Sequence, residues 1–260
     1  MEEKKRGNGI FLGVVAVATL IVAIIGATFA YFSITAQSDE NAVNLSAYEF
    51  TATLSVNPVA PTGTFKGLIP MDPDAAVTNG GGATNLEYAV NTATSPCVDS
   101  NGYQVCAVYS LIFENTATSP MTLTGTLKTT VNDAATETVG EPGQETTQTK
   151  AGRTAFTDLK IRTATEASGS YTFDEESGST FEAAVPSSTT DGSNTVAIGS
   201  VTVPAESTLT KYIVVYLDGT DDANDNGVDQ SAQMGAHYEG QLIYESSAGN
   251  KLTGTFNVGP

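Results

Sequence analysis

The chain contains no tryptophan and a single histidine, His237, and this scarcity removes several kinds of catalytic site. One imidazole cannot build a histidine-rich zinc site or the two-histidine HExxH helix of a metalloprotease. The sequence also has no G-x-S-x-G segment, no phosphate-binding glycine loop and no dinucleotide-binding glycine pattern. Adjacent carboxylates, such as Glu175 and Glu176, are common in an acidic chain and indicate solvated surface. We therefore expect no enzyme activity and no required cofactor.

Basic residues are scarce as well, with 11 Lys+Arg against 29 Asp+Glu and a net charge of −18. Residues 1–30 hold three basic and two acidic side chains, so the remaining chain has 8 Lys+Arg, 27 Asp+Glu and a net charge of −19. Such a charge repels phosphate groups, which argues against nucleic acid and against anionic lipid as partners. It favours solubility and cation binding, although a plainly solvated surface would have the same composition.

The chain has only two cysteines, Cys97 and Cys106, and they bracket the segment "VDSNGYQV". Asn101-Gly102 within this segment is a strong hairpin turn signal, so two strands leaving the turn would bring the thiols together. Their spacing differs from the redox C-x-x-C motif, and no histidine lies nearby to complete a metal site. In an oxidising compartment we expect a local structural disulfide.

Charge is also missing from residues 7–38, directly after a basic cluster formed by Lys4, Lys5 and Arg6. The apolar run Ile10–Phe32 has 23 residues, long enough to span a bilayer as a helix. Small residues follow in the manner of a secretory signal, with Ala30 at the −1 position of a cut that would make Tyr31 the new N-terminus.

Two interpretations of residues 1–30 stay open, because the apolar run is longer than that of a usual signal peptide. The segment is either a cleaved signal peptide or a retained N-terminal transmembrane anchor. A type IV pilin leader is disfavoured, because no glutamate follows Gly7 or Gly9 closely. Both remaining interpretations predict export, with the basic end left in the cytoplasm and the rest secreted or held at the cell surface.

Beyond the leader, alternating apolar residues separated by Gly, Pro, Asn, Asp and Ser clusters predict strands throughout. "YQVCAVYSLIFEN" places Tyr109, Leu111 and Phe113 on one face, and the run Tyr212–Leu217 is apolar on both faces, as in a central strand. We expect residues 46–260 to form one all-β domain, an antiparallel β-sandwich. The side chains expected in its core are Tyr109, Leu111, Phe113, Leu123, Leu127, Val214, Tyr216, Leu242 and Tyr244.

Three polar intervals predict long loops that decorate the sandwich without forming a second core. They cover residues 57–84, 132–154 and 167–193. No solenoid repeat is present.

The segment 222–233, "DANDNGVDQSAQ", resembles the start of a calcium-binding loop. The candidate ligands are the side chains of Asp222, Asn224 and Asn226 and the carbonyl of Val228. Oxygen donors at alternate positions curl around a calcium ion and offset its charge. However, Gln233 stands where a bidentate glutamate is expected, and an acidic hairpin loop would contain the same residues. Calcium binding is therefore a hypothesis here.

Taken together, "GATFAYFS", "YSLIFENTATSPMTLTGTLKT" and "DQSAQMGAHYEGQLIYESSA" resemble the TasA/camelysin family of exported β-sandwich proteins. Leaders of that family are processed by the SipW type of signal peptidase and end in an A-[YF]-F box, matched here by Ala30, Tyr31 and Phe32. The strand patterns match at Phe113–Leu127 and at Tyr238–Ala248. The metalloprotease activity described for camelysin-like proteins is not implied, because this chain lacks the zinc ligands.

The resemblance implies a jelly-roll-like subunit of extracellular matrix fibres, as in biofilms, in which an N-terminal segment adds as a strand to the neighbouring subunit. Residues 31–45 suit this role, because Phe32, Ile34 and Ala36 alternate with polar residues and "QSDEN" follows as a tether. An open sheet edge on the next molecule would pair this strand and bury its apolar side chains. Alternatively, residues 31–36 are the tail of the anchor or the first strand of their own domain.

Two functions from different classes follow. The first is a secreted structural subunit, cut after Ala30, that forms pilus-like or matrix fibres from copies of itself. The second is a membrane-anchored cell-surface adhesin or binding module, stiffened by calcium, that touches the membrane only through its N-terminal segment.

Overall fold

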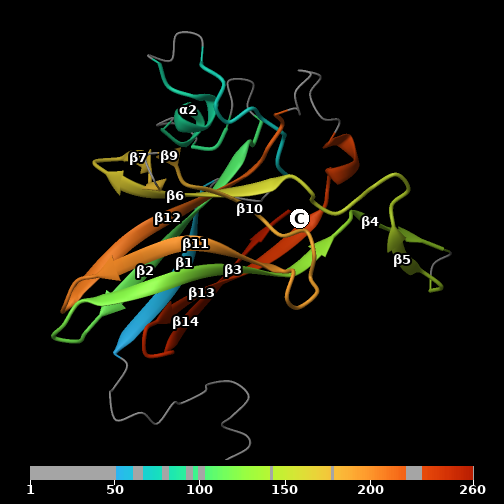
Figure 1. The fold of residues 1–260 in the computed structure, drawn as a ribbon. Helices are drawn as coiled ribbons and strands as arrows, with labels where there is room; N and C mark the ends of the chain where they lie inside the picture. Colours follow the sequence, from blue (N-terminus) through green and yellow to red (C-terminus); the bar gives the residue numbers. More distant parts are fainter. Residues whose placement is uncertain are drawn as a thin grey trace, which may run out of the picture. The chain divides into compact units, whose positions relative to one another are not determined.

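The computed structural model describes residues 51–60, 67–77, 82–91, 96–98, 103–140, 143–176, 179–220 and 230–259 (Figure 1). The chain divides into two units, Met1–Glu49 and Phe50–Pro260, and every described residue belongs to the second. The predicted leader, the cleavage position and the donor-strand segment 31–45 lie outside the described residues. So does the segment 221–229, which holds the candidate calcium ligands.

The described residues form strands with one short α-helix and one 3-10 helix. The elements are β1 (Ala52–Ala60), α2 (Asn85–Asn91), β2 (Cys106–Asn115), β3 (Met121–Asp133), β4 (Thr136–Val139), β5 (Thr146–Thr149), β6 (Leu159–Ala167), β7 (Ser170–Phe173), β8 (Glu175–Glu176), β9 (Ser179–Thr180), β10 (Glu182–Ala184), β11 (Thr195–Val203), β12 (Ser207–Leu217), η1 (Gln230–Gln233), β13 (His237–Ser246) and β14 (Lys251–Val258).

Two antiparallel sheets pack face to face as a sandwich. The first sheet has the order β1-β2-β12-β6-β10, with β7 paired to β6, and the second has the order β11-β3-β13-β14. All the strand pairs within them are antiparallel. The predicted fold class, an all-β antiparallel sandwich, is confirmed at this level for the described residues.

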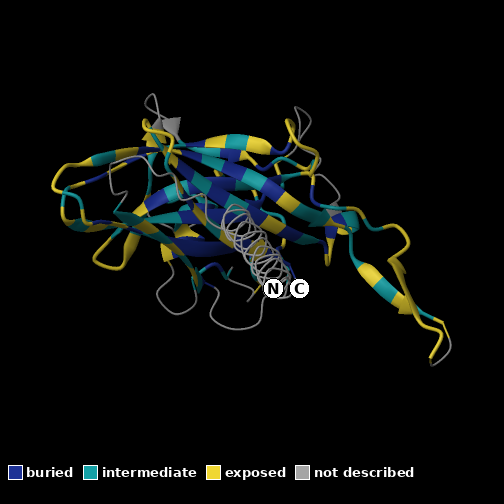
Figure 2. Ribbon diagram, turned by 90° about the horizontal axis from the view of Figure 1, so that it is seen from below, coloured by how far each residue is buried: buried dark blue, intermediate teal, exposed yellow. Residues whose placement is uncertain are grey.

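The main core lies between the inner faces of the two sheets. All nine side chains predicted to be buried are at most 6% exposed, and Leu111, Leu123, Leu127 and Leu242 are fully enclosed. The alternation of buried and exposed positions along the strands is visible in Figure 2. Burying a leucine or phenylalanine side chain contributes about 1.5–3 kcal/mol, so this layer is the main source of stability.

Strand β12 is central, as its two-sided apolar run predicted. It pairs with β2 on one side and β6 on the other. Ile213 and Val215 point into the main core, whereas Val214 and Tyr216 belong to a separate cluster on the outer face of the same sheet. A strand buried on both faces needs a second layer over the sheet, and the chain supplies one.

That second layer, here called the cap, consists of residues 67–77, α2, residues 96–98 and residues 103–105 (Figure 1). Leu86, Ala89 and Val90 of α2 pack on the outer cluster together with Tyr216 and Val108. The expectation that the loops show no second core is therefore wrong. The predicted loop 57–84 holds cap residues, and the remainder of the cap follows it directly.

The predicted loops also contain strands that the sequence pattern did not indicate. Strand β1 continues to Ala60, with Pro58 tolerated because β1 is an edge strand. β4 and β5 pair with each other to form a hairpin, here called the arm, which projects away from the two sheets in Figures 1 and 2. Strands β7 to β10 occupy the third predicted loop and extend the first sheet or pair locally.

Candidate functional site

The two long sides of the sandwich differ in how their side chains pack. Val56 packs against Gly254 on the side here called closed, and a groove lies on the side here called open, although backbone pairing joins the edge strands on neither side of the described structure. On the closed side, Gly254 of β14 leaves room for Val56 of β1: a Cβ on this glycine would lie 2.3 Å from the Val56 side chain. The two edge strands therefore interlock there. On the other side β11 ends the second sheet and β10 ends the first, and no backbone pairing joins them in the described structure.

A cleft with a volume of about 350 Å³ runs along this open side, and it is called the groove below. Its apolar lining comes from three strands and one connection that are far apart in sequence, and consists of Leu111, Phe181, Ile198, Val201 and Tyr244. Strand β11 forms one wall and has a free edge, because within the described structure it pairs only with β3. Free strand edges with an apolar floor are sites where another strand can add.

A β-bulge shapes this wall. The register between β11 and β3 shifts between Ala197 and Ser200, and Gly199 has a φ of 82°. This left-handed conformation is easy only for glycine, which explains the residue at this point. The bulge bends β11 where Ile198 and Val201 line the groove.

The rim of the groove is charged. Lys211 of β12 pairs with Asp174 at 2.8 Å and also donates to the Thr165 hydroxyl at 2.8 Å. Glu175 completes the polar lining. An apolar floor with a polar rim is the usual layout of a protein-binding surface, because the rim stays hydrated while the centre loses water.

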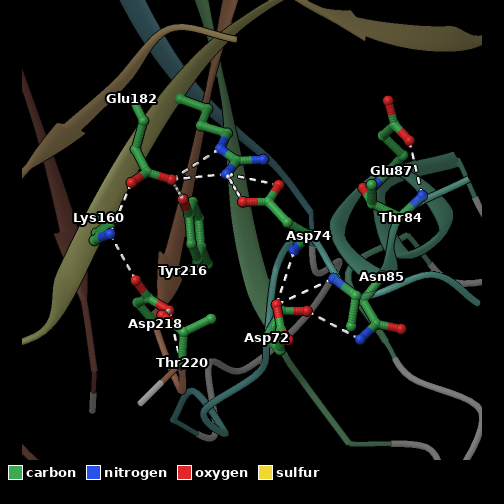
Figure 3. Close-up of polar contacts among 12 residues, drawn as sticks. Asp72, Asp74, Thr84, Asn85, Glu87, Lys160, Glu182, Tyr216, Asp218 and Thr220 are labelled. Carbon is green, nitrogen blue, oxygen red and sulfur yellow. Dashed lines mark hydrogen bonds and ion pairs between the residues drawn. The ribbon is translucent and has the colours of Figure 1, made fainter. Parts of the chain in front are cut away.

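A second polar feature lies under the cap, on the outer face of the first sheet, and is centred on Arg162 of β6. Figure 3 shows its members Asp74, Glu182 and Tyr216 close together. Arg162 as a whole residue is 4% exposed. Its guanidinium donates two hydrogen bonds to the Glu182 carboxylate, at 2.7 and 3.0 Å. It also donates to both carboxylate oxygens of Asp74 in the cap, at 3.0 and 3.1 Å. The rings of Phe173 and Tyr216 lie 5.6 and 5.4 Å from the guanidinium carbon, within cation–π range.

Glu182 is the shared acceptor of this network. It lies opposite Arg162 in the β10–β6 pairing and accepts hydrogen bonds from Arg162, Lys160 and the Tyr216 hydroxyl. Burial alone would raise the pKa of Glu182, but these donors outweigh it and hold the pKa below its ordinary value. Glu182 therefore stays ionised, and burial together with its bond to Glu182 raises the pKa of Tyr216.

Lys160 extends the network to the end of β12. Its ammonium lies 2.7 Å from Glu182 and 2.6 Å from Asp218. Burial would raise the pKa of Asp218, but hydrogen bonds from Lys160 and Thr220 hold it lower. Each charge in this cluster has an opposite charge beside it. The arrangement suits fastening the cap to the sheet.

The cap is also organised from within. Thr84 and Glu87 form a capping box at the start of α2, in which the Thr84 amide donates to Glu87 at 2.8 Å and the Glu87 amide to the Thr84 hydroxyl at 3.4 Å. The Asp72 carboxylate accepts from the amides of Asp74 and Ala75, both at 3.0 Å. Asp74 is thereby placed for its contact with Arg162.

The predicted disulfide between Cys97 and Cys106 is present, with Cα atoms 4.8 Å apart. It joins the cap to the first residue of β2, and both cysteines are fully buried. Only a single backbone bridge, Val98 with Gln104, stands where two strands were expected, and the Asn101-Gly102 turn lies outside the described residues.

The other residues predicted to be functional cannot be placed. Ala30 and Tyr31 at the cleavage position, and Phe32, Ile34 and Ala36 of the donor strand, precede the described residues. Asp222, Asn224, Asn226 and Val228 lie in the undescribed segment 221–229. Within the described residues, no group of three or more His, Cys, Asp or Glu side chains could hold a metal, and no helix is long and apolar enough to cross a membrane.

Comparison with known proteins adds little. No protein-family model matches the chain, and no curated protein matches its sequence. Among solved structures it is similar to the sporulation control protein Spo0M from Bacillus subtilis, with 6% identity, a TM-score of 0.29, and coverage of 80% of this chain and 49% of that one.

A second solved structure is a family 123 glycoside hydrolase from Clostridium perfringens that hydrolyses glycolipid glycans. It shows 10% identity, a TM-score of 0.26, and coverage of 59% of this chain and 21% of that one. The chain thus spans about half of the first protein and about a fifth of the second. Likenesses this weak carry no argument about fold or function.

Proposed function

We propose that this protein is a secreted structural subunit that polymerises by donating an N-terminal strand to the groove of a neighbouring copy. The observation that carries the proposal is the groove itself, with its free β11 edge and its apolar floor. The resemblance to the TasA/camelysin family, and with it the jelly-roll-like arrangement, belongs to the same proposal.

The donor and the acceptor match in chemistry. Residues 31–36, "YFSITA", alternate apolar and polar side chains, so Phe32 and Ile34 would face the floor while the other face stays in water. Backbone groups of the added strand would pair with the free edge of β11. Burying Phe32 and Ile34 would contribute about 1.5–3 kcal/mol each, before the entropy cost of ordering the segment.

The proposal requires that Tyr31 become the N-terminus, because a retained leader would hold the segment at the membrane. Cleavage after Ala30 releases the strand, and the tether "QSDEN" lets it reach another molecule. A head-to-tail contact of this kind does not close on itself and therefore generates filaments.

Cysteine crosslinking between two variants tests the contact directly. One preparation carries Ile34→Cys and the other Ser200→Cys, which is exposed at the groove. We expect a disulfide-linked heterodimer only when the two are mixed under oxidising conditions. Ser33→Cys is the matched control, because its side chain alternates to the opposite face, and it should crosslink at least tenfold less.

Polymerisation of Ile34→Asp subunits gives the functional readout, after N-terminal sequencing of the exported protein has located the cut. We expect the domain to stay folded and filaments to disappear, because a buried unpaired carboxylate costs several kcal/mol. Filaments of normal length from Ile34→Asp would contradict the donor-strand contact. An exported protein that keeps residues 1–30 and sediments with membranes would favour the anchored surface module instead.

A further inference from the structure

A second recess lies at the base of the arm, and its lining differs in charge from the rest of the molecule. It has a volume of about 610 Å³ and lies between the end of β3, the arm and the start of β13. Its lining includes the basic side chains of Lys150 and Arg153, together with His237, Asp133 and Met234. We call this the cationic recess.

The two basic side chains of the recess are distinctive because no ion pair joins either of them to a described carboxylate; the Arg153 guanidinium donates instead to the neutral carbonyl of Ser231. Every other basic residue in the described part of the chain pairs with a carboxylate: Lys128 with Asp191, Lys160 with Glu182 and Asp218, Arg162 with Asp74 and Glu182, Lys211 with Asp174, and Lys251 with Glu245. Lys150 and Arg153 have no such partner among the described carboxylates. Asp133 lines the same recess and offsets one of the two charges.

Other groups in the recess are also left open to a partner. The Nδ1 atom of His237 is buried and has no hydrogen-bond partner among the described residues. Its Nε2 atom lies 3.2 Å from Glu239. Met234 is 60% exposed, the highest value among the large exposed hydrophobic side chains of the described structure. A cationic rim beside an exposed methionine suits a contact that combines carboxylates with some apolar area.

The arm beside the recess is incomplete as a folded element. β4 and β5 pair through four residues each, and β5 is exposed along its whole length. An isolated two-stranded hairpin is marginally stable in water, and no other described strand pairs with either outer edge of the arm. Such an element gains stability when another chain lies against it.

We propose that the cationic recess binds acidic side chains of a second copy of this chain, making a second contact between subunits in addition to the groove. The partner follows from charge, because the chain without residues 1–30 has 8 Lys+Arg against 27 Asp+Glu and so presents many carboxylates to another copy. Copies so acidic repel one another, and the recess is the place in the described structure where unpaired cations can turn that repulsion into attraction. This inference rests on the proposed function, because it concerns the same polymer.

Zero-length crosslinking is the direct experiment. Filaments grown from a mixture of ¹⁵N-labelled and unlabelled exported protein are treated with a carbodiimide, which joins a lysine amine to a carboxylate in contact with it. We expect Lys150 to appear in crosslinked peptides that combine the two labels. Lys251, which has its own partner Glu245, should give such peptides at a tenth of that level or less.

Assembly of charge-reversal variants gives an independent readout. Lys150→Glu/Arg153→Glu is compared with the matched control Lys128→Glu/Lys251→Glu, which changes the net charge equally but away from the recess. We expect the recess variant to assemble at least tenfold more slowly than the control at low ionic strength, and the difference to shrink in high salt.

The outcomes separate the recess from the groove. Equal assembly of the two charge-reversal variants, or Lys150 crosslinks confined to a single chain, would overturn the recess contact while leaving the donor-strand polymer intact. Lys150 crosslinked to a different protein in unfractionated exported material would assign the recess to that partner and would also overturn it. If the unaltered protein forms no filaments at all, the proposed function fails and the recess contact fails with it.

Discussion

Arg162 shows how a local sequence pattern can indicate a strand and still conceal the environment of a side chain. In "LKIRT" the charged side chains of Lys160 and Arg162 alternate with apolar ones, which by itself indicates a face turned toward water. The structure covers that face with the cap, so the guanidinium is buried against two rings and two carboxylates. Its partners Glu182 and Asp74 lie 20 and 88 positions away in the sequence, and a local sequence pattern cannot reveal contacts with such separations.

Glu182→Gln is expected to lower stability at pH 7 and to weaken its dependence on acid. The folded state holds the pKa of Glu182 below its ordinary value of 4.5, so protons bind the unfolded chain more readily. The stabilisation is complete above that value and is lost as the pH falls toward the lower folded pKa. Urea unfolding at pH 7, 5, 4 and 3 should show a flatter decline for the variant than for the parent.

The size of the effect at pH 7 distinguishes a buried network from a surface pair. Loss of the shared acceptor leaves Arg162 with only part of its counter-charge, and we expect a cost of about 2–4 kcal/mol. The control Glu245→Gln breaks an exposed pair with Lys251 and should cost less than about 1 kcal/mol. Equal losses in the two variants would show that the buried network contributes no more to stability than an exposed pair.

At the scale of elements, α2 and the disulfide act as one unit. The Cys97 amide donates to the Ala89 carbonyl of α2 at 2.8 Å, and the Val105 amide donates to the Cys97 carbonyl at 3.0 Å. A helix of seven residues is too short to be stable alone and depends on this attachment. The cap is therefore expected to open separately from the two sheets.

Cys97→Ala/Cys106→Ala is expected to destabilise the cap selectively. Removing a disulfide that closes a short loop costs about 2–3 kcal/mol. Amide hydrogen exchange should rise strongly in α2, whereas β12 and β13 should keep most of their protection. A uniform rise across α2, β12 and β13 would mean instead that cap and sandwich unfold together.

Strands β2, β3 and β13 could be predicted from apolar residues at alternate positions, and β12 from a run that is apolar on both faces. The arm could not, because "TETV" and "TTQT" contain almost no apolar side chains and its pairing buries none. The helix α2 was missed although Thr84 and Glu87 carry a capping-box signature that could have located it. The groove could not be predicted, because its position depends on which strand edges remain unpaired. The apolar pattern of a single strand does not reveal which strands lie beside it in the sheet.

For the whole molecule, the excess of acidic groups is the dominant electrostatic fact. Five of the basic residues that the structure describes are used in internal ion pairs, which leaves the surface strongly negative. Self-repulsion of this kind destabilises a compact state and is relieved by salt and by bound cations. A general effect of cations must therefore be separated from a specific site.

Calcium is expected to raise the melting temperature through the segment 222–228, and not only by screening. Binding to the folded state alone makes the shift grow with calcium concentration. At equal ionic strength, calcium should stabilise the parent more than magnesium does. Asp222→Ala should lose this difference, while Asp191→Ala, at an exposed carboxylate, should keep it. If Asp222→Ala responds to calcium like the parent, the segment is only an acidic turn.

The close approach of Val56 and Gly254 ties the two sheets together at single residues. A Cβ at Gly254 would lie 2.3 Å from the Val56 side chain, so any larger residue there would push β1 away from β14. Val56 packs against the main core, and the displaced edge would let water into the layer between the sheets. The absence of a side chain at one position is therefore a packing requirement of the whole sandwich.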